Sequence, residues 1–140
     1  MDLELLEKAL ENDDNINIID TNIQEIKKKK NDILQQLNLN KDDLKSYHKK
    51  LLNYIYIDEI KDLKYGNHIR WINLKNIENI RITNGAILCD IKIIDKGISL
   101  VLRTYTNSFI TLLLNEHLLF QRINDQEKIL LKAIEYLNKK

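Results

Sequence analysis

Residues 69–123 read IRWINLKNIENIRITNGAILCDIKIIDKGISLVLRTYTNSFITLLLNEHLLFQRI, and this stretch decides the fold. Three turn signals separate its short apolar segments: Asn84-Gly85, Asp95-Lys96-Gly97 and Thr106-Asn107-Ser108. Each connection is shorter than the crossover that joins parallel strands. The stretch therefore predicts an antiparallel β-meander, in which Asn84-Gly85 forms a type I′ turn that pairs residues 80–83 with residues 86–89.

Strand positions follow from side-chain chemistry. On residues 86–94, Asp90 and Lys92 share one face, and the other face is expected to be core because it carries Ile87, Cys89, Ile91 and Ile93. Cys89 falls on the apolar face, which predicts a buried and unreactive thiol. Aromatic and β-branched residues favour a strand at 68–74. Further strands are expected at 77–83, 98–104, 109–114 and 118–123.

Two helices are expected before the strands. Thr21-Asn22-Ile23-Gln24 matches a capping box and begins the first helix. Asn40, followed by Asp42 and Asp43, begins the second helix, which is expected to continue to Ile55. Because three or four residues join them, the two helices should form an αα-hairpin. The apolar seam of the first helix has coiled-coil spacing, includes Lys30 and predicts self-association through Ile23, Ile26, Ile33 and Leu37.

A third helix is expected at the C-terminal end. Asn124 precedes Asp125-Gln126-Glu127, which is a second capping pattern, and an apolar stripe from Ile129 to Leu137 follows. The predicted fold is therefore α+β, with an N-terminal helical hairpin at 1–62 and a sheet with its covering helix at 63–140. The sheet is expected to be antiparallel and curled, with five or six strands.

Composition narrows the class of protein. The chain has 140 residues, 44% of them hydrophobic and 31% charged, which fits a soluble domain with one core. No apolar run approaches the length of a membrane span. The acidic start, Met1-Asp2-Leu3-Glu4, is unlike a secretory signal, and the single Cys89 suits a reducing compartment. We therefore expect a cytoplasmic protein without membrane insertion.

Charge is distributed unevenly along the chain. Residues 1–20 carry a net charge of −6, residues 21–64 carry +3, and residues 65–140 carry +4. The abundance of Ile, Asn and Lys, with no Pro, indicates an AT-rich genome. The run Lys27-Lys28-Lys29-Lys30 is therefore interpreted as a solvated helix face, although a stripe that contacts phosphates is the alternative.

Arginines are the candidate binding residues, because an AT-rich genome disfavours them. Arg70, Arg81, Arg103 and Arg122 all lie on predicted strands. Together with Trp71 and Tyr105, they could bind nucleic acid by charge and stacking. The alternative is that they form cross-strand pairs with Asp90 and Glu116.

Signals for other chemistry are not found in the sequence. His48, His68 and His117 lack the spacing of a zinc site, and the carboxylates at Asp58, Glu59 and Asp62 are expected at a solvated helix end. The glycines fit turns and not a phosphate loop. We therefore expect a protein that is not an enzyme and that has no metal or cofactor.

Two resemblances add to this interpretation. The stretch Ile80-Arg81-Ile82-Thr83-Asn84-Gly85, continuing through Asp95 to Leu100, resembles the first conserved block of Sm-like proteins. That resemblance implies a small bent barrel of five strands with an N-terminal helix, in a family that forms RNA-holding rings. The asparagine that contacts RNA in that family has no counterpart after Gly97.

The second resemblance covers residues 54–137. Tyr65-Gly66-Asn67-His68-Ile69-Arg70-Trp71-Ile72, Thr83-Asn84-Gly85 and Phe120-Gln121-Arg122-Ile123 are similar to segments of small uncharacterised proteins of large nucleocytoplasmic DNA viruses. This similarity implies a viral factory or virion context. The sequence predicts a structural or scaffolding protein that self-associates through its helical segment, and the alternative is a nucleic-acid-binding module that uses Arg70, Trp71, Arg81 and Arg103.

Overall fold

The structure is a computed structural model that describes residues 3–15, 18, 21–76 and 78–138. It contains two compact units, one made of residues 1–38 and 123–140 and the other of residues 39–122. The predicted boundary between residues 62 and 63 falls inside the second unit. In chain order the helices and strands are α1 (Leu3–Glu11), α3 (Ile23–Gln35), α4 (Lys41–Lys50), β1 (Tyr54–Ile57), β2 (His68–Asn73), β3 (Ala86–Ile94), β4 (Gly97–Arg103), β5 (Phe109–Leu113), β6 (His117–Arg122) and α5 (Asp125–Asn138).

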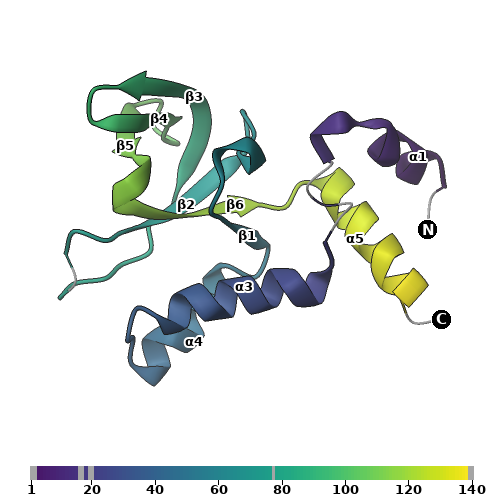
Figure 1. The fold of residues 1–140 in the computed structure, drawn as a ribbon, viewed down its shortest axis with the longest axis horizontal. Helices are drawn as coiled ribbons and strands as arrows, with labels where there is room; N and C mark the ends of the chain where they lie inside the picture. The colour runs from purple at the N-terminus through teal and green to yellow at the C-terminus, as the bar shows by residue number, and fades with distance from the viewer. Residues whose placement is uncertain (1–2, 16–17, 19–20, 77, 139–140) are drawn as a thin grey trace. The chain divides into compact units, whose positions relative to one another are not determined.

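The second unit is built on one antiparallel sheet of six strands, which is open (Figure 1). Its order is β1-β6-β2-β3-β4-β5. The meander from β3 to β5 is as predicted, β2 pairs directly with β3, and the final strand returns to lie between β1 and β2. A short 3₁₀ turn, Leu114–Glu116, connects β5 to β6. The α+β class is confirmed, with helices that precede and follow the strands along the sequence.

One face of this sheet carries the apolar core of the unit. Ile69 and Trp71 of β2 point to this face, as the alternation of a strand requires. Gln121 of β6 lies among them, 1% exposed, and its amide bonds the Asp62 carbonyl and the Lys64 N–H at 2.9 and 2.7 Å. The buried apolar residues are Ile57, Leu63, Ile69, Trp71, Ala86, Leu88, Leu100, Leu102, Leu112 and Leu119.

The expected second helix is shorter than predicted. It begins as expected, because the Asn40 side chain accepts a hydrogen bond from the Asp43 N–H at 2.8 Å. It ends at Lys50, and β1 occupies Tyr54–Ile57, where the helix was expected to continue. The sequence Tyr-Ile-Tyr-Ile has high β-propensity, and pairing with β6 stabilises it as a strand.

The expected strand at 77–83 is wrong, and so is the type I′ turn. In the described part of this segment only Ile82 forms a bridge, with Ile72, and Thr83 exchanges bonds with the Trp71 backbone. Ala86 then pairs with Ile69. Between the Trp71–Thr83 and Ile69–Ala86 pairs, β2 has one residue and the other segment has two. Asn84-Gly85 is therefore a bulge within the pairing with β2 and not a hairpin turn. Gly85 has φ +89°, whereas Asn84 has no positive φ.

The first unit joins the two ends of the described chain. α1 packs on α5, and Asn12 and Asn15 donate to the Gln126 side chain at 2.8 and 3.2 Å. The cap of α5 is the predicted reciprocal box, since Asn124 and Glu127 bond each other's N–H groups. α3 begins one residue later than expected, with Asn22 as its cap. The packing of α5 on the sheet would join the two units and stays a prediction.

Candidate nucleic-acid interface

A row of side chains crosses the sheet on the face opposite the core. Paired residues on neighbouring antiparallel strands project to the same side. Tyr54 pairs with Arg122, His68 with Ile87, Ile87 with Arg103, and Arg103 with Phe109. Continuing the β2–β6 register by one residue places Arg122 opposite His68. We call this set the cross-strand row: Tyr54, Arg122, His68, Ile87, Arg103 and Phe109.

The β1–β6–β2 end of the row is tightly packed around His68. Tyr54 Oη lies 2.8 Å from His68 Nδ1, and the two rings meet edge-on at 5.9 Å. Arg70, two residues along β2 on the same face, places its guanidinium 5.3 Å from the centre of the Tyr54 ring. Burial lowers the pKa of His68, and the charges of Arg70 and Arg122 lower this pKa further. His68 is therefore neutral at pH 7, and the arginines supply the positive charge.

Arg103 and Phe109 form the other end of the row, where β4 turns into β5. Arg103 is exposed, and Phe109 keeps 66% of its surface accessible. The turn between them is held by Thr104, whose hydroxyl accepts from the Ser108 N–H, and by Asn107, which adopts φ +63°. Tyr105, at the same turn, is 93% exposed. An arginine and two aromatic rings are thus presented to solvent on a rigid hairpin.

The structure brings together only some of the predicted binding residues. Arg70 and Arg103 lie on the same sheet face, and Arg122 joins them. Trp71 is 9% exposed and belongs to the core on the other face, so its ring cannot stack on a base. Arg81 lies in the irregular 74–85 segment, where it donates to Asn79 at 3.1 Å.

Tyr54, His68 and Phe109 were not predicted as site residues. Alternation along each strand could have shown which face they occupy. The register between strands aligns these residues into one row, and this register cannot be predicted from the sequence of any single strand.

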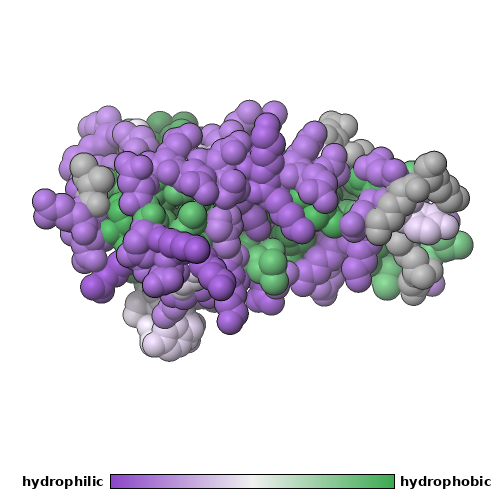
Figure 2. Space-filling model, turned by 90° about the horizontal axis from the view of Figure 1, so that it is seen from below, coloured by the Kyte–Doolittle hydropathy of each residue, from purple (hydrophilic) through white to green (hydrophobic). Residues whose placement is uncertain are grey.

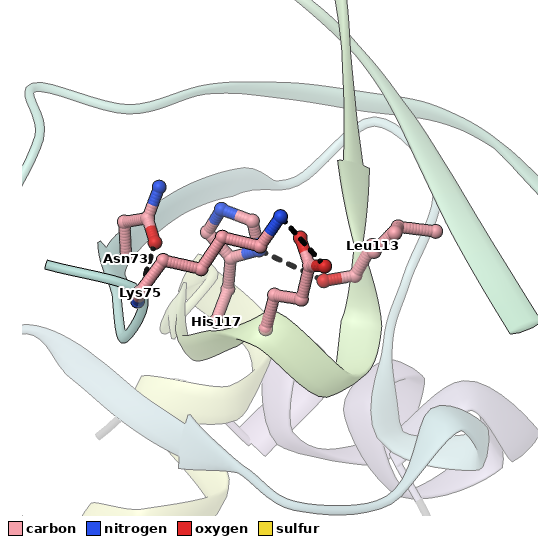
Figure 3. A network of polar contacts seen from close by, with 5 residues as sticks. Asn73, Lys75, Leu113 and His117 are labelled. Atoms are coloured by element: carbon pink, nitrogen blue, oxygen red, sulfur yellow. Dashed lines mark hydrogen bonds and ion pairs between the residues drawn. The ribbon is translucent and has the colours of Figure 1, made fainter. Parts of the chain in front are cut away.

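The alternative pairing of the arginines with Asp90 and Glu116 is not seen among the described residues. Glu116 is instead 3.0 Å from Lys75 Nζ (Figure 3). Asp90 accepts a bond from the Ile91 N–H at 2.9 Å. Arg103 and Arg122 make no ion pair with any carboxylate that the structure describes, so both guanidinium groups can bind an external anion.

Three of the four residues predicted to self-associate lie on α3, and Leu37 lies in the turn that follows it. Ile26 is buried, and Ile23, Ile33 and Leu37 are half-buried. Lys30 lies on the same side and is 5% exposed, and burial, followed by the charge of Lys27, lowers its pKa from 10.5 to about 8. The other three lysines of the run are exposed. Whether the α3 residues mediate self-association stays a prediction.

Cys89 and His117 are the next polar groups outside the row. Cys89 is exposed, so the prediction of a buried thiol is wrong, and the expected core face of β3 is also wrong at Ile87 and Ile93. A bulge between Leu88 and Asp90 shifts the alternation, so that Ala86 and Leu88 are core residues before it. His117 bonds the Leu113 carbonyl through Nδ1 at 2.8 Å (Figure 3). In residues 3–15, 18, 21–76 and 78–138, no group of three His, Cys, Asp or Glu side chains is placed to hold a metal ion.

Neither the comparison with known proteins nor the helices of the described chain point to a partner. The chain matches no protein-family model, no curated protein and no solved structure. None of the helices built from described residues has the length and hydrophobicity of a membrane span. Hydrophilic side chains cover most of the face seen in Figure 2, where hydrophobic atoms appear in small separate groups.

Proposed function

We propose that this protein is a non-enzymatic module that binds single-stranded nucleic acid along the cross-strand row. The observation that carries the proposal is the alignment of Arg122 and Arg103 on one sheet face, with no carboxylate partner in the described chain and with the exposed ring of Phe109 beside Arg103. Arginine planes bind phosphates and stack on bases, and an aromatic ring on a sheet is a platform for a base.

The dimensions of the row suit a single strand. Tyr54, at the β1 end of the row, is 7% exposed, so the accessible part runs from Arg122 on β6 to Phe109 on β5. Neighbouring strands lie about 4.8 Å apart, so this part, across five strands, is about 19 Å long. Modules of comparable size bind from about four nucleotides upward along such a path. Because strand pairing already fixes the backbone of the row, binding orders the arginine side chains but not the strands that carry them.

Binding is tested by fluorescence anisotropy with labelled single-stranded RNA and DNA oligonucleotides. The double variant Arg103→Gln/Arg122→Gln should lose about tenfold or more in affinity, and its affinity should fall less steeply with salt between about 50 and 200 mM, because two phosphate contacts are removed. The matched control is Lys27→Gln/Lys28→Gln/Lys29→Gln, which removes three exposed charges from α3 and should change affinity little. Loss of binding in the lysine variant alone would place the site elsewhere, and no binding by the wild type at about 50 mM salt would remove the proposal.

A structural or scaffolding role is the second candidate. It is favoured by the partial exposure of three seam residues, which leaves apolar surface for a protein partner or a second copy. They are Ile23 and Ile33 of α3, and Leu37 in the turn after it. Light scattering of Ile33→Gln/Leu37→Gln should then show a smaller assembly than the wild type. The similarity to proteins of large nucleocytoplasmic DNA viruses supports a host-cytoplasmic, viral-factory or virion location for either role.

A further inference from the structure

β5 is the last strand of the sheet, and its backbone determines what it can bind. Thr104 N donates to Ser108 O at 2.8 Å, next to the pair Arg103–Phe109. In an antiparallel ladder, directly bonded pairs alternate with non-bonded pairs. Ile110 and Leu112 therefore bond β4, whereas the N–H and C=O groups of Phe109 and Thr111 and the N–H of Leu113 point to the open edge. The Leu113 carbonyl already accepts a hydrogen bond from His117.

This edge lacks the usual protection against pairing. Natural edge strands carry lysines, prolines or bulges that keep other strands away. The sequence of β5 is Phe-Ile-Thr-Leu-Leu, with no charge and no proline, and its pairing with β4 is regular. Protection begins at its last residue, where His117 bonds the Leu113 carbonyl, and continues past its end, where Lys75 meets Glu116 (Figure 3).

We propose that β5 pairs antiparallel with β5 of a second copy of this chain, about a two-fold axis at Thr111. The directions of the edge groups fix the register, because only residues 109, 111 and 113 can bond outward. A two-fold axis at Thr111 pairs Thr111 with Thr111 of the other copy. It also pairs Phe109 with Leu113 of the other copy. This register pairs all three positions, with the Leu113 carbonyl accepting a second bond beside the one from His117, whereas a shift by two residues leaves Phe109 or Leu113 unpaired.

The side chains of β5 are complementary in this register. Threonine pairs with threonine, an arrangement whose hydroxyls can bond across strands, and Phe109, 66% exposed, meets a leucine. No like charges face each other along the five residues of β5. A patch that pairs with itself in this way gives a closed dimer, as most homo-oligomers have.

The dimer extends the sheet to twelve strands and places two cross-strand rows on one continuous sheet. The inference stands independently of nucleic-acid binding, because it rests on backbone groups. An interface of five residues on each side is smaller than a standard one, so we expect a dissociation constant in the micromolar range. Dimerisation should therefore be visible between about 5 and 200 µM protein.

Multi-angle light scattering and sedimentation of the full chain without nucleic acid test the proposal. The wild type should approach twice the mass of one chain as concentration rises. Thr111→Lys places two like charges opposite each other at the axis, and should weaken dimerisation by about tenfold or more. Thr111→Val keeps the backbone groups and β-propensity, and it should remain dimeric. The melting temperature of each variant, measured at the lowest concentration, confirms that the monomer is folded.

Cross-linking tests the register directly. In a Cys89→Ser background, Thr111→Cys should form a disulfide between copies on oxidation, because directly opposed residues lie about 5.5 Å apart. Phe109→Cys in the same background is the control, since the two copies of residue 109 lie several residues apart and should not link. A wild type that is monomeric at about 200 µM overturns the proposal, as does a dimer that Thr111→Lys leaves intact or that links through residue 109.

Discussion

Gly85 illustrates how a single residue position sets the path of a strand. Its φ of +89° is unfavourable for any side chain, and a Cβ at this position would collide with the Ile69 carbonyl oxygen and with His68 Cε1. The glycine therefore allows β3 to lie directly against β2 at the bulge, and it leaves space for His68 in the cross-strand row.

Replacing this glycine separates backbone strain from steric collision. Gly85→Ala should lower the free energy of unfolding by about 3 kcal/mol, since it adds a collision to the cost of positive φ. Gly66→Ala is the matched control: Gly66 has φ +83°, and a Cβ added there would have nothing within 4 Å. This control should cost only about 1 kcal/mol. Urea unfolding of both variants gives the difference, and equal costs would contradict the close approach to β2.

The same dipeptide explains why the sequence predicted the wrong turn. Asn-Gly between apolar segments is typical of a type I′ hairpin, and the glycine does adopt positive φ. A bulge also requires such a glycine, and only the pairing of Ile82 and Ala86 with the same strand distinguishes the two structures. Local chemistry thus predicted the conformation of Gly85 but not its place in the sheet.

At the scale of an element, β1 and the cross-strand row both depend on pairing between strands, which a local segment of sequence does not predict. Strands β2 to β6 and the caps of α4 and α5 could be located from alternation, turn residues and capping side chains, whereas the cap of α3 was predicted one residue too early. β1 could not, because four residues directly after a helix extend its apolar pattern, and pairing with the distant β6 decides their conformation. The face of Arg70 and Arg103 was likewise predictable from alternation, but their alignment with Arg122 and Phe109 depends on the registers between strands.

Lys30 makes the stability of α3 depend on pH. Its pKa is lowered to about 8 in the folded state, against 10.5 when unfolded, so the unfolded state binds more protons between these values. The free energy of unfolding should therefore rise with pH from about 8 to 10.5. Below about pH 8, Lys30 is charged in both states, and the cost of burying its charge is fully present.

Lys30→Met should remove this cost. We expect the variant to be more stable than the wild type by about 1 kcal/mol near pH 7, because methionine fills a similar volume without a charge. The gain should shrink as pH rises past about 8 and be smallest above 10.5. Thermal melting across this range measures it, with Lys28→Met, at an exposed position of the same helix, as the control. A gain that does not vary with pH would show that Lys30 does not titrate in this range.

At the scale of the whole molecule, the chain brings its two ends together in one unit and places the sheet in the other. α1 and α5 are far apart in sequence, and the Gln126 side chain accepts from both Asn12 and Asn15. Asn15 is 1% exposed and also donates to the Ala9 carbonyl at 2.8 Å. Buried amides that lose their acceptor are costly, so this junction should control the opening of the first unit.

Gln126→Leu tests whether the two units open separately. The variant leaves the amides of Asn12 and Asn15 without their shared acceptor, which should cost the first unit about 1–3 kcal/mol. Hydrogen exchange should then become faster in α1 and α5 by about tenfold or more, whereas the buried amides of Leu100 and Leu102 in β4 should exchange as in the wild type. Gln24→Leu, at an exposed position on α3, is the control and should leave both regions unchanged. If exchange in β4 accelerates as much as in α5, the molecule unfolds as one cooperative body, and the sheet with its cross-strand row depends on the helices at the chain ends for its stability.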